Sequence, residues 1–445
     1  MYRKLKVPMN IQFEITSKCN EKCVHCYNYW RNKSDTSNKT LNMSLSLFDK
    51  CMDEIIRHKV LHLIFTGGEP FLNFDVLLHG IQRCVANKMS VSCNSNLLNV
   101  NDKKIKQLKE VGLKHILTSL NSHNPATNDF MVSHQGAHKK IVRNIQKMID
   151  SGINISTNMI VSKYNLLDVY ETAKLSHELG VKKIHVTRVV PPSYICGEMR
   201  KDFSFDDKKM EAVFNQIDNI SSDIPIEVKT LIPYPLCALK DLDKYKNLVG
   251  RPCAAGKRAM SIDSEGRGHA CWHMTQDFGS IVEEGLDVVW DKMGEWRSGQ
   301  LIPVECKKCP YLALCGGGCR VAGNVFNGAL SSPDNLRAGW ENISKEYSGG
   351  TGVDDVDVPL EEIAKFYKEA SVSGKFRVAD INIREENGFS VIQIHAGTSF
   401  FLEEKYVVIL EKMKQLKTFC LEDFGQQYTK LFSYFLTKGA INEKI

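Results

Sequence analysis

The residues best suited to chemistry are three cysteines, Cys19, Cys23 and Cys26, spaced C-x3-C-x2-C after an apolar run at residues 11–15 that predicts a strand. A four-iron cluster has four corners to ligate, normally with thiolates. Three cysteines in one loop would hold three irons and leave the fourth open to a ligand from outside the protein. The alternatives are three unrelated buried thiols or a zinc site, for which neighbouring His25 is badly placed as the fourth ligand.

This loop resembles the cluster loop of the radical S-adenosylmethionine (radical SAM) enzymes, with His25 in the position that is usually aromatic. The resemblance implies a catalytic [4Fe–4S] cluster on Cys19, Cys23 and Cys26, whose open iron binds S-adenosylmethionine. It also implies reductive cleavage of that cosubstrate to methionine and a 5′-deoxyadenosyl radical. A low-potential electron donor, such as a flavodoxin or ferredoxin, is then an expected partner.

Composition limits the other classes of function. The 445 residues, 43% of them hydrophobic, are enough for two or three domains with ordinary cores. The net charge of +6 is spread along the chain without a dense Lys/Arg block, so no nucleic-acid partner is expected. With no signal peptide and no stretch able to span a bilayer, the sequence predicts a cytoplasmic protein without a membrane partner. Fifteen cysteines in such a chain favour metal or redox chemistry over disulfides.

Segments typical of strands and helices alternate from residue 10 to residue 188. Strands are predicted at 10–15, 61–65, 90–93, 116–120, 153–161 and 183–188, and helices at 44–58, 74–86, 102–111, 137–151 and 166–179. Parallel neighbours need a crossover helix, so the alternation predicts an α/β fold with a parallel sheet. A doubly wound sheet fits this pattern too. The family resemblance implies instead a partial (β/α)6 TIM-like barrel.

In such barrels the chemistry is built on loops at the carboxyl ends of the strands. Gly67, Gly68 and Glu69 follow the second predicted strand. The glycines allow the backbone to approach a ligand without a Cβ in the way, and the carboxylate can oppose an ammonium. The segment resembles the family's Gly-Gly-Glu motif, which holds the methionyl amino group.

By the same resemblance, Ser119 would contact the ribose and Asn94 would bind the cosubstrate after the third strand. Cys93-Asn94-Ser95 replaces the usual Thr-Asn-Gly, and Asn121 stands where an aspartate is common. Arg188, at the end of the sixth strand, would either meet the ligand carboxylate or form a salt bridge at the barrel rim.

A second cysteine-rich region follows, in which Cys306, Cys309, Cys315 and Cys319 are spaced C-x2-C-x5-C-x3-C. The glycines at 316–318 let the backbone fold tightly around an inorganic core and offer amides to its sulfides. The spacing alone fits tetrahedral zinc equally well.

With Cys253 and Gly266 ahead of Cys271, this run resembles the SPASM extension, which carries auxiliary iron–sulfur clusters behind radical SAM barrels. The family arrangement implies one or two auxiliary clusters, the first on Cys253, Cys271 and Cys319 and the second on Cys306, Cys309 and Cys315. The family's final cysteine is missing from residues 331–336. The second cluster would then take Asp334 or an incoming thiol, leave an iron open for substrate, or be absent; Cys237 is a spare thiol that would complete either cluster.

The tail predicts a separate module. Residues 344–359 are rich in Gly and Asp and indicate a linker, and residues 376–383 and 389–395 alternate around Glu386-Asn387-Gly388 as in a hairpin. A third strand at 399–402 and a helix at 421–436 follow. The order resembles winged-helix-like modules that bind a leader peptide as an added strand. The alternative is a domain that buttresses the barrel or dimerises.

The predicted organisation is a radical SAM barrel at 1–192, a bridging region at 193–236, an auxiliary cluster domain at 237–343, and a leader-binding module at 360–445. The predicted function is modification of a ribosomally made precursor peptide by hydrogen abstraction, giving a thioether, a carbon–carbon or carbon–oxygen crosslink, or an epimerised residue. The alternatives are a formylglycine-generating sulfatase maturase, a small-molecule oxidase, and a zinc-binding peptide adaptor without radical chemistry.

Overall fold

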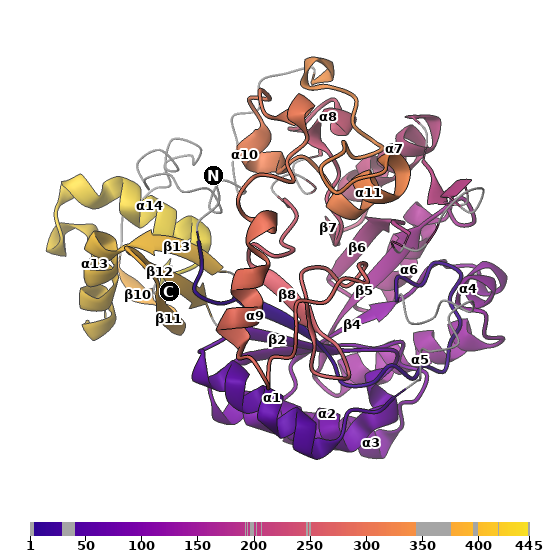
Figure 1. Cartoon of the computed structure of the whole chain (residues 1–445), viewed down its shortest axis with the longest axis horizontal. Helices are drawn as coiled ribbons and strands as arrows, with labels where there is room; N and C mark the ends of the chain where they lie inside the picture. Colours follow the sequence, from indigo (N-terminus) through magenta and orange to yellow (C-terminus); the bar gives the residue numbers. More distant parts are fainter. Residues whose placement is uncertain are drawn as a thin grey trace. The chain divides into compact units, whose positions relative to one another are not determined.

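The computed structural model forms two compact units, Val7–Lys345 and Met1–Lys6 with Glu346–Ile445 (Figure 1). The described residues are 4–28, 41–191, 193, 195, 200–201, 203–205, 207–245, 248, 251–343, 375–394, 399–416 and 418–443. The linker predicted at 344–359 lies outside them. Within the described ranges, no helix is both long enough and apolar enough to cross a membrane.

The larger unit is built on a nine-stranded sheet in the order β7-β6-β5-β4-β3-β2-β1-β8-β9. The strands are β1 (Asn10–Glu14), β2 (His62–Thr66), β3 (Ser90–Asn94), β4 (His115–Ser119), β5 (Asn154–Val161), β6 (Lys183–Arg188), β7 (Glu227–Lys229), β8 (Ala259–Ile262) and β9 (Gly268–His269). Each pairing from β7 to β8 is parallel, and β9 is antiparallel to β8. The predicted α/β fold with a parallel sheet is therefore confirmed.

The sheet is wider than the predicted six strands. At one edge β7 pairs with β6, and on the other side β8 pairs with β1 in register from Asn10–Ala259 to Phe13–Ile262. These added strands have only three and four residues. Such short segments carry too little periodicity to be recognised in the sequence. As a result, a segment assigned to the cysteine-rich region becomes part of the barrel sheet.

Helices connect the parallel strands, and α1, α2, α3 and α5 lie along the outer side of the curved sheet (Figure 1). The helices are α1 (Leu45–Arg57), α2 (Phe74–Ala86), α3 (Asp102–Glu110), α4 (Pro125–Val132), α5 (Ala137–Asp150), α6 (Val169–Glu178) and α7 (Asp207–Asp223). Helix α1 buries Phe48, Cys51 and Ile55, which share one face at helical spacing. Its first turn is capped by Ser44 Oγ, which accepts from Leu47 N at 3.2 Å.

Three phenylalanines join the first two strands to the helices outside them. The Phe13 ring stacks on Phe48 with 5.3 Å between centroids, and Phe65 lies 6.1 Å from Phe48. Gly80 of α2 gives these rings room, since a Cβ there would lie 2.5 Å from Phe65 and 2.7 Å from Phe48. Each fully buried phenylalanine stabilises the fold by roughly 1.5–3 kcal/mol. The cluster fixes the strands whose following loops form the site.

The cysteine-rich part of the larger unit has little regular structure. It contains the short helices α8 (Leu236–Leu239), α9 (Leu286–Lys292), α10 (Leu312–Cys315) and α11 (Arg320–Asn327). Short 3-10 helices lie there at Gly294–Trp296, Val304–Cys306 and Trp340–Asn342, and a further one follows β2 in the barrel at Pro70–Asn73. Glycines 316, 317 and 318 all have positive φ, between 64° and 81°, and turn the chain sharply between α10 and α11.

The smaller unit is an α+β module. Its strands are β10 (Phe376–Val378), β11 (Ile381–Glu385), β12 (Phe389–Ile394), β13 (Ser399–Glu403) and β14 (Ile441–Glu443), and its helices are α13 (Glu404–Gln415) and α14 (Thr429–Lys438). The predicted hairpin is confirmed as β11–β12, with β13 as the third antiparallel strand. The strand predicted at 376–383 is divided, because β10 pairs instead with β14. Helix α14 starts later than predicted, after Gly425 at φ 104° interrupts the helical path.

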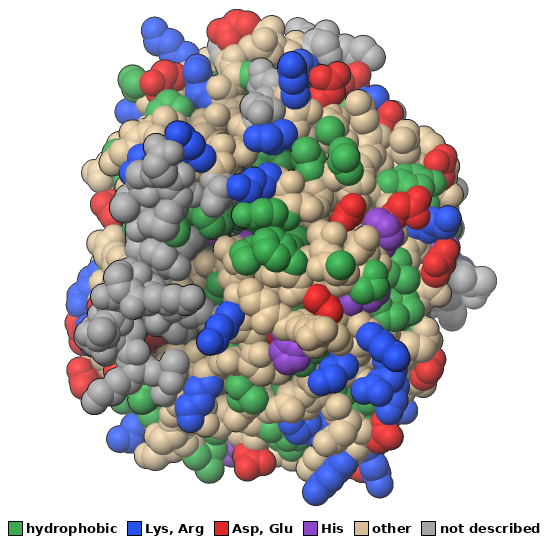
Figure 2. Space-filling view, turned by 90° about the vertical axis from the view of Figure 1, so that its right-hand side faces the viewer, with side chains coloured by type: hydrophobic (Ala, Val, Ile, Leu, Met, Phe, Trp, Pro, Cys, Tyr) green, Lys and Arg blue, Asp and Glu red, His purple; other side chains and the backbone are tan. Residues whose placement is uncertain are grey.

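Charged side chains of both signs are interspersed over the face shown in Figure 2. The chain carries 58 Lys and Arg against 52 Asp and Glu.

Candidate active site and thiol clusters

A cavity of about 280 Å³ opens at the carboxyl ends of the parallel strands. Its wall gathers residues from the loops after β1 and β2 and from the ends of β3 to β6. The predicted site residues that line it are Cys19, Cys23, His25, Cys26, Gly67, Gly68, Glu69, Asn94, Ser119 and Arg188. The structure therefore brings together ten residues from five separate segments at the place where barrel enzymes carry out chemistry.

The loop that carries Cys19, Cys23 and Cys26 is held by backbone hydrogen bonds. Lys22 N donates to Val132 O at 3.2 Å and Val24 N donates to Met131 O at 2.9 Å. Both acceptors lie in the last turn of α4, whose C-terminal carbonyls have no partner within the helix. Helix α4 was not predicted from the sequence, although Asn124 and Pro125 form a good helix start.

Gly67 and Gly68 bring the loop after β2 directly against the cysteine loop. Gly68 N donates to Thr16 O at 2.7 Å, and Glu69 N donates to Lys18 O at 2.7 Å. A Cβ on Gly67 would lie 2.1 Å from Thr16 O, and one on Gly68 would lie 2.0 Å from Lys18 O. The predicted reason for these glycines was approach to a ligand. The structure adds that the two loops can meet only without these side chains.

The Glu69 carboxylate is buried and held in one position. Its Oε1 accepts from Ser95 Oγ at 2.7 Å and Phe71 N at 3.1 Å, and its Oε2 accepts from Asn96 N at 2.8 Å. Burial raises the pKa of Glu69 to about 7, and the hydrogen bonds from Asn96, Ser95 and Phe71 limit the rise. A carboxyl group with this pKa changes its charge readily when a cation comes near.

The loop after β3 contributes more than the predicted Asn94. Ser95 and Asn96 hold Glu69, and Asn96 Nδ2 also donates to Asn20 Oδ1 at 2.7 Å. One side chain thus links this loop to the cysteine loop. The polar run Asn94-Ser95-Asn96 at a strand end was the available signal, but the sequence did not show which of the three would act.

Asn121 is buried but does not line the cavity. Its Oδ1 accepts from Ile160 N at 3.1 Å, and its backbone oxygen accepts from Asn165 Nδ2 at 2.6 Å. The side chain of Asn121 therefore ties the end of β4 to β5, and its backbone oxygen ties it to the loop after β5. Ser119, two residues earlier, remains on the cavity wall.

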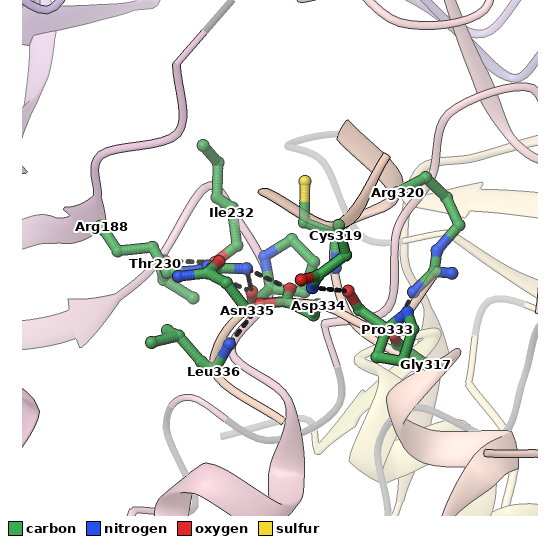
Figure 3. A network of polar contacts seen from close by, with 12 residues as sticks. Arg188, Thr230, Ile232, Gly317, Cys319, Arg320, Pro333, Asp334, Asn335 and Leu336 are labelled. Atoms are coloured by element: carbon green, nitrogen blue, oxygen red, sulfur yellow. Dashed lines mark hydrogen bonds and ion pairs between the residues drawn. The ribbon is translucent and has the colours of Figure 1, made fainter. Parts of the chain in front are cut away.

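Arg188 forms the salt bridge that was one of its two predicted roles. Its guanidinium is buried, forms an ion pair with Asp334 and donates to Pro233 O at 3.1 and 3.0 Å (Figure 3). The Asp334 carboxylate also accepts from Cys319 N at 2.7 Å and Leu336 N at 3.1 Å. Asp334, predicted as one possible cluster ligand, is therefore engaged by protein donors. In Figure 3 the Cys319 sulfur points away from it.

Cys253, Cys271 and Cys319 form the first thiol cluster. Burial raises the pKa of Cys271 well above its usual value, and the charges of Cys253 and Cys319 raise it further. Burial also raises the pKa of Cys319 to about 11, with Arg188 opposing and Cys253 adding to the rise. Thiols that raise one another's pKa values must lie close together. The family arrangement implies such a grouping for a first auxiliary cluster.

Cys237, Cys306, Cys309 and Cys315 form the second thiol cluster, which lines a narrow pocket of about 30 Å³. Burial raises the pKa of Cys315 to about 11, and Cys237 and Cys306 add to the rise. Among the described residues, no three His, Cys, Asp or Glu side chains are arranged to hold a metal ion. The thiolates of an iron–sulfur cluster bind different irons, so they surround a core without converging on one point.

Part of the cavity wall comes from the cysteine-rich part. His273 stacks on Tyr27 with 4.9 Å between ring centroids, and Trp272 and Arg251 also line the cavity. Burial lowers the pKa of His273 to about 4, so the ring is neutral at physiological pH. Burial likewise lowers the pKa of His25 to about 4. Sequence reasoning did not predict this wall, which forms only when distant segments pack together.

Residues 13–176 match the family model of the Radical SAM superfamily. This part of the chain is a radical SAM domain, and the protein is an enzyme of the kind that the cysteine loop predicted. Its cofactors are S-adenosylmethionine and a [4Fe–4S] cluster. Cys19, Cys23 and Cys26, grouped in one loop on the cavity wall beside the buried Glu69, fit that pair of cofactors.

Two curated relatives cover most of the chain. The AdoMet-dependent heme synthase of Methanosarcina barkeri is 22% identical over 346 residues, 74% of this chain and 95% of the relative. The antilisterial bacteriocin subtilosin biosynthesis protein AlbA of Bacillus subtilis is 26% identical over 332 residues, 70% of this chain and 67% of the relative. Among solved structures, Streptococcus suis SuiB bound to its precursor peptide SuiA has a TM-score of 0.60 at 17% identity, covering 74% of this chain and 75% of that one. The chain shares this fold and resembles SPASM-type peptide maturases.

Proposed function

We propose that this enzyme modifies a ribosomally made precursor peptide by abstracting a hydrogen atom inside the 280 Å³ cavity. The observation that carries the proposal is that one cavity is lined by the Cys19–Cys26 loop, by Glu69 and by Trp272 and His273 of the cysteine-rich part. Similarity to AlbA and to SuiB, which was solved with its precursor peptide, supports a peptide substrate.

Cys19, Cys23 and Cys26 would hold a [4Fe–4S] cluster, which together with bound S-adenosylmethionine would supply the hydrogen-abstracting chemistry. The protein's own residues orient the reactants and exclude water. Glu69, held by Ser95 and Asn96, would oppose the methionyl ammonium, and Ser119 would offer a hydroxyl to the ribose. Arg188 is engaged by Asp334 and Pro233, so it supports the wall rather than gripping a ligand carboxylate. The stacked rings of Tyr27 and His273 form another part of the cavity wall.

A small-molecule substrate is the second candidate, because the chain covers 95% of the M. barkeri heme synthase. Arg251 lines the cavity and offers a positive charge to carboxylates. A radical SAM domain disfavours the zinc-binding adaptor considered from the sequence.

The test uses anaerobically reconstituted enzyme with dithionite and S-adenosylmethionine. One arm contains peptides encoded by short reading frames beside the gene, and the other contains an iron porphyrin. We expect a peptide to lose two hydrogens for each crosslink, or to exchange an α-hydrogen with deuterated solvent on epimerisation, as seen by mass spectrometry. The Cys19/Cys23/Cys26→Ala variant is the matched control. Turnover with the porphyrin and none with any peptide would overturn the proposal.

A further inference from the structure

Cys237 is brought to the second thiol cluster by a segment far from the other three cysteines. It lies in α8, whereas Cys306 ends a 3-10 helix and Cys315 ends α10. All three line one pocket together with Cys309, and all four carry free thiols. The fourth sulfur that the C-x2-C-x5-C run lacks is therefore present in space.

Every sulfur of this cluster receives an N–H donor. Ala338 N donates to Cys237 Sγ at 3.4 Å, and the Arg337 side chain donates to Cys306. Backbone amides donate to the remaining two, from Tyr311 to Cys309 and from Leu236 and Gly317 to Cys315. Hydrogen bonds to the sulfurs stabilise thiolates and tune the potential of iron–sulfur clusters.

The segment after Asp334 supports the same arrangement. By resemblance, residues 331–336 would have carried the missing cysteine, but Asp334 there binds Arg188 and Cys319 N. The adjacent Arg337 and Ala338 instead supply donors to Cys306 and Cys237. This segment thus supports the second thiol cluster from outside, while α8 supplies the ligand.

We propose that Cys237, together with Cys306, Cys309 and Cys315, ligates a second auxiliary [4Fe–4S] cluster in which every iron has a protein thiolate. Such a site has no open iron for substrate and serves electron transfer. The inference rests on the proposed function only in that the chain holds iron–sulfur clusters. Its readout, bound iron, does not depend on which substrate the enzyme takes.

The experiment uses the full chain, reconstituted anaerobically and then transferred to thiol-free buffer so that no added thiol replaces a ligand. The Cys19/Cys23/Cys26→Ala protein is the parent, because all its remaining iron is auxiliary. In this parent, Cys237→Ala is expected to lose about one to four irons per chain, with a three-iron EPR signal after mild oxidation. Cys420→Ala, which removes a thiol from the smaller unit, is the matched control and is expected to lose none.

Cys237→Ser keeps the inference testable if Cys237→Ala does not fold. Its oxygen ligand is expected to retain the iron while shifting the reduction potential of one auxiliary cluster. Unchanged iron, sulfide and EPR spectra in Cys237→Ala, or an unchanged potential in Cys237→Ser, would overturn the inference. So would one zinc per chain in the parent that is lost with Cys237.

Discussion

The cysteine loop and the second thiol cluster both offer cysteine thiols, but they differ in the number of thiols and in the space beside them. The loop presents Cys19, Cys23 and Cys26 to a cavity of about 280 Å³, whereas the second thiol cluster places four thiols around a pocket of about 30 Å³. Metal sites that perform chemistry keep an open position beside room for a ligand, and closed sites do not. We therefore expect the three-thiol site to carry the reaction and propose that the four-thiol site transfers electrons.

The two sites also differ in the charge around their sulfurs. The Cys23 thiol lies 3.5 Å from Glu21 Oε2, a carboxylate oxygen, whereas Cys237 Sγ accepts from Ala338 N. A nearby negative charge disfavours adding an electron, and an N–H donor favours it. We therefore expect the lower reduction potential at the loop, where reductive cleavage of a sulfonium requires a strong reductant.

The largest expected effect comes from removing the open site. In Cys19/Cys23/Cys26→Ala, formation of 5′-deoxyadenosine is expected to fall to background, because the open iron is gone. Auxiliary iron is expected to remain, since the other thiol clusters lie outside the loop. Chromatography of the nucleoside and an iron assay measure the two. Persistent 5′-deoxyadenosine would contradict the assignment of this loop.

The next effect tests the ion pair that joins the barrel to the cysteine-rich part. Asp334→Ala leaves the Arg188 charge buried without its partner, which we expect to destabilise the protein by roughly 3–5 kcal/mol. The midpoint of chemical denaturation under anaerobic conditions measures it. Lys106→Ala, in the exposed pair with Glu110 at 3.8 Å, is the control and is expected to change stability by less than about 0.5 kcal/mol. Equal shifts in the two variants would show that Asp334 does not join the barrel to the cysteine-rich part.

A smaller effect concerns the pH dependence of S-adenosylmethionine binding in the cavity beside the Cys19–Cys26 loop. Because the pKa of Glu69 is raised to about 7, its carboxyl group is protonated below that pH and ionised above it. An ammonium prefers the ionised form, so affinity for S-adenosylmethionine should increase roughly tenfold from pH 6 to pH 8. The free energy of unfolding of the ligand-free protein has the opposite pH dependence. Because the folded state favours the protonated form of Glu69, this free energy falls as pH rises from about 4.5 to 7. Titration calorimetry of the enzyme and of Glu69→Gln compares the slopes. A slope that persists in Glu69→Gln would assign it elsewhere.

The smallest effect sharpens the difference in charge. Glu21→Gln removes the carboxylate beside Cys23 and should raise the reduction potential of the loop cluster by roughly 30 mV, about half of a tenfold step. Potentiometric EPR measures this in the enzyme. The auxiliary potentials serve as the internal control. A shift in those, or none at the loop, would count against the electrostatic explanation.

Much of the barrel could be predicted from local patterns. Strands β1 to β6 alternate with amphipathic helices, and that alternation requires a parallel sheet. Strands β7 and β8 were missed because three or four residues carry no clear period and their pairing depends on distant partners. Helix α4 had a readable start at Asn124, but its link to the cysteine loop is a tertiary contact.

The site followed the same rule. The Cys19–Cys26 loop and Gly67–Glu69 are contiguous motifs, so their place on one wall could be expected. Asn121 also follows a strand, yet its side chain bonds the backbone of Ile160 and does not line the cavity, an orientation set by packing. The sequence identified Cys237 only as a spare thiol and did not show which of the two clusters it would complete. Its place beside Cys315 depends on how α8 meets α10.

The stacking of Tyr27 on His273 makes the cysteine-rich part a portion of the cavity wall. Tyr27 directly follows Cys26, and His273 comes two positions after Cys271. The cavity lining thus comes from separate stretches of chain that meet at one aromatic contact. Substitutions in the cysteine-rich part can therefore reshape the cavity for a different substrate without altering the Cys19–Cys26 loop, provided that the contact between Tyr27 and His273 is kept.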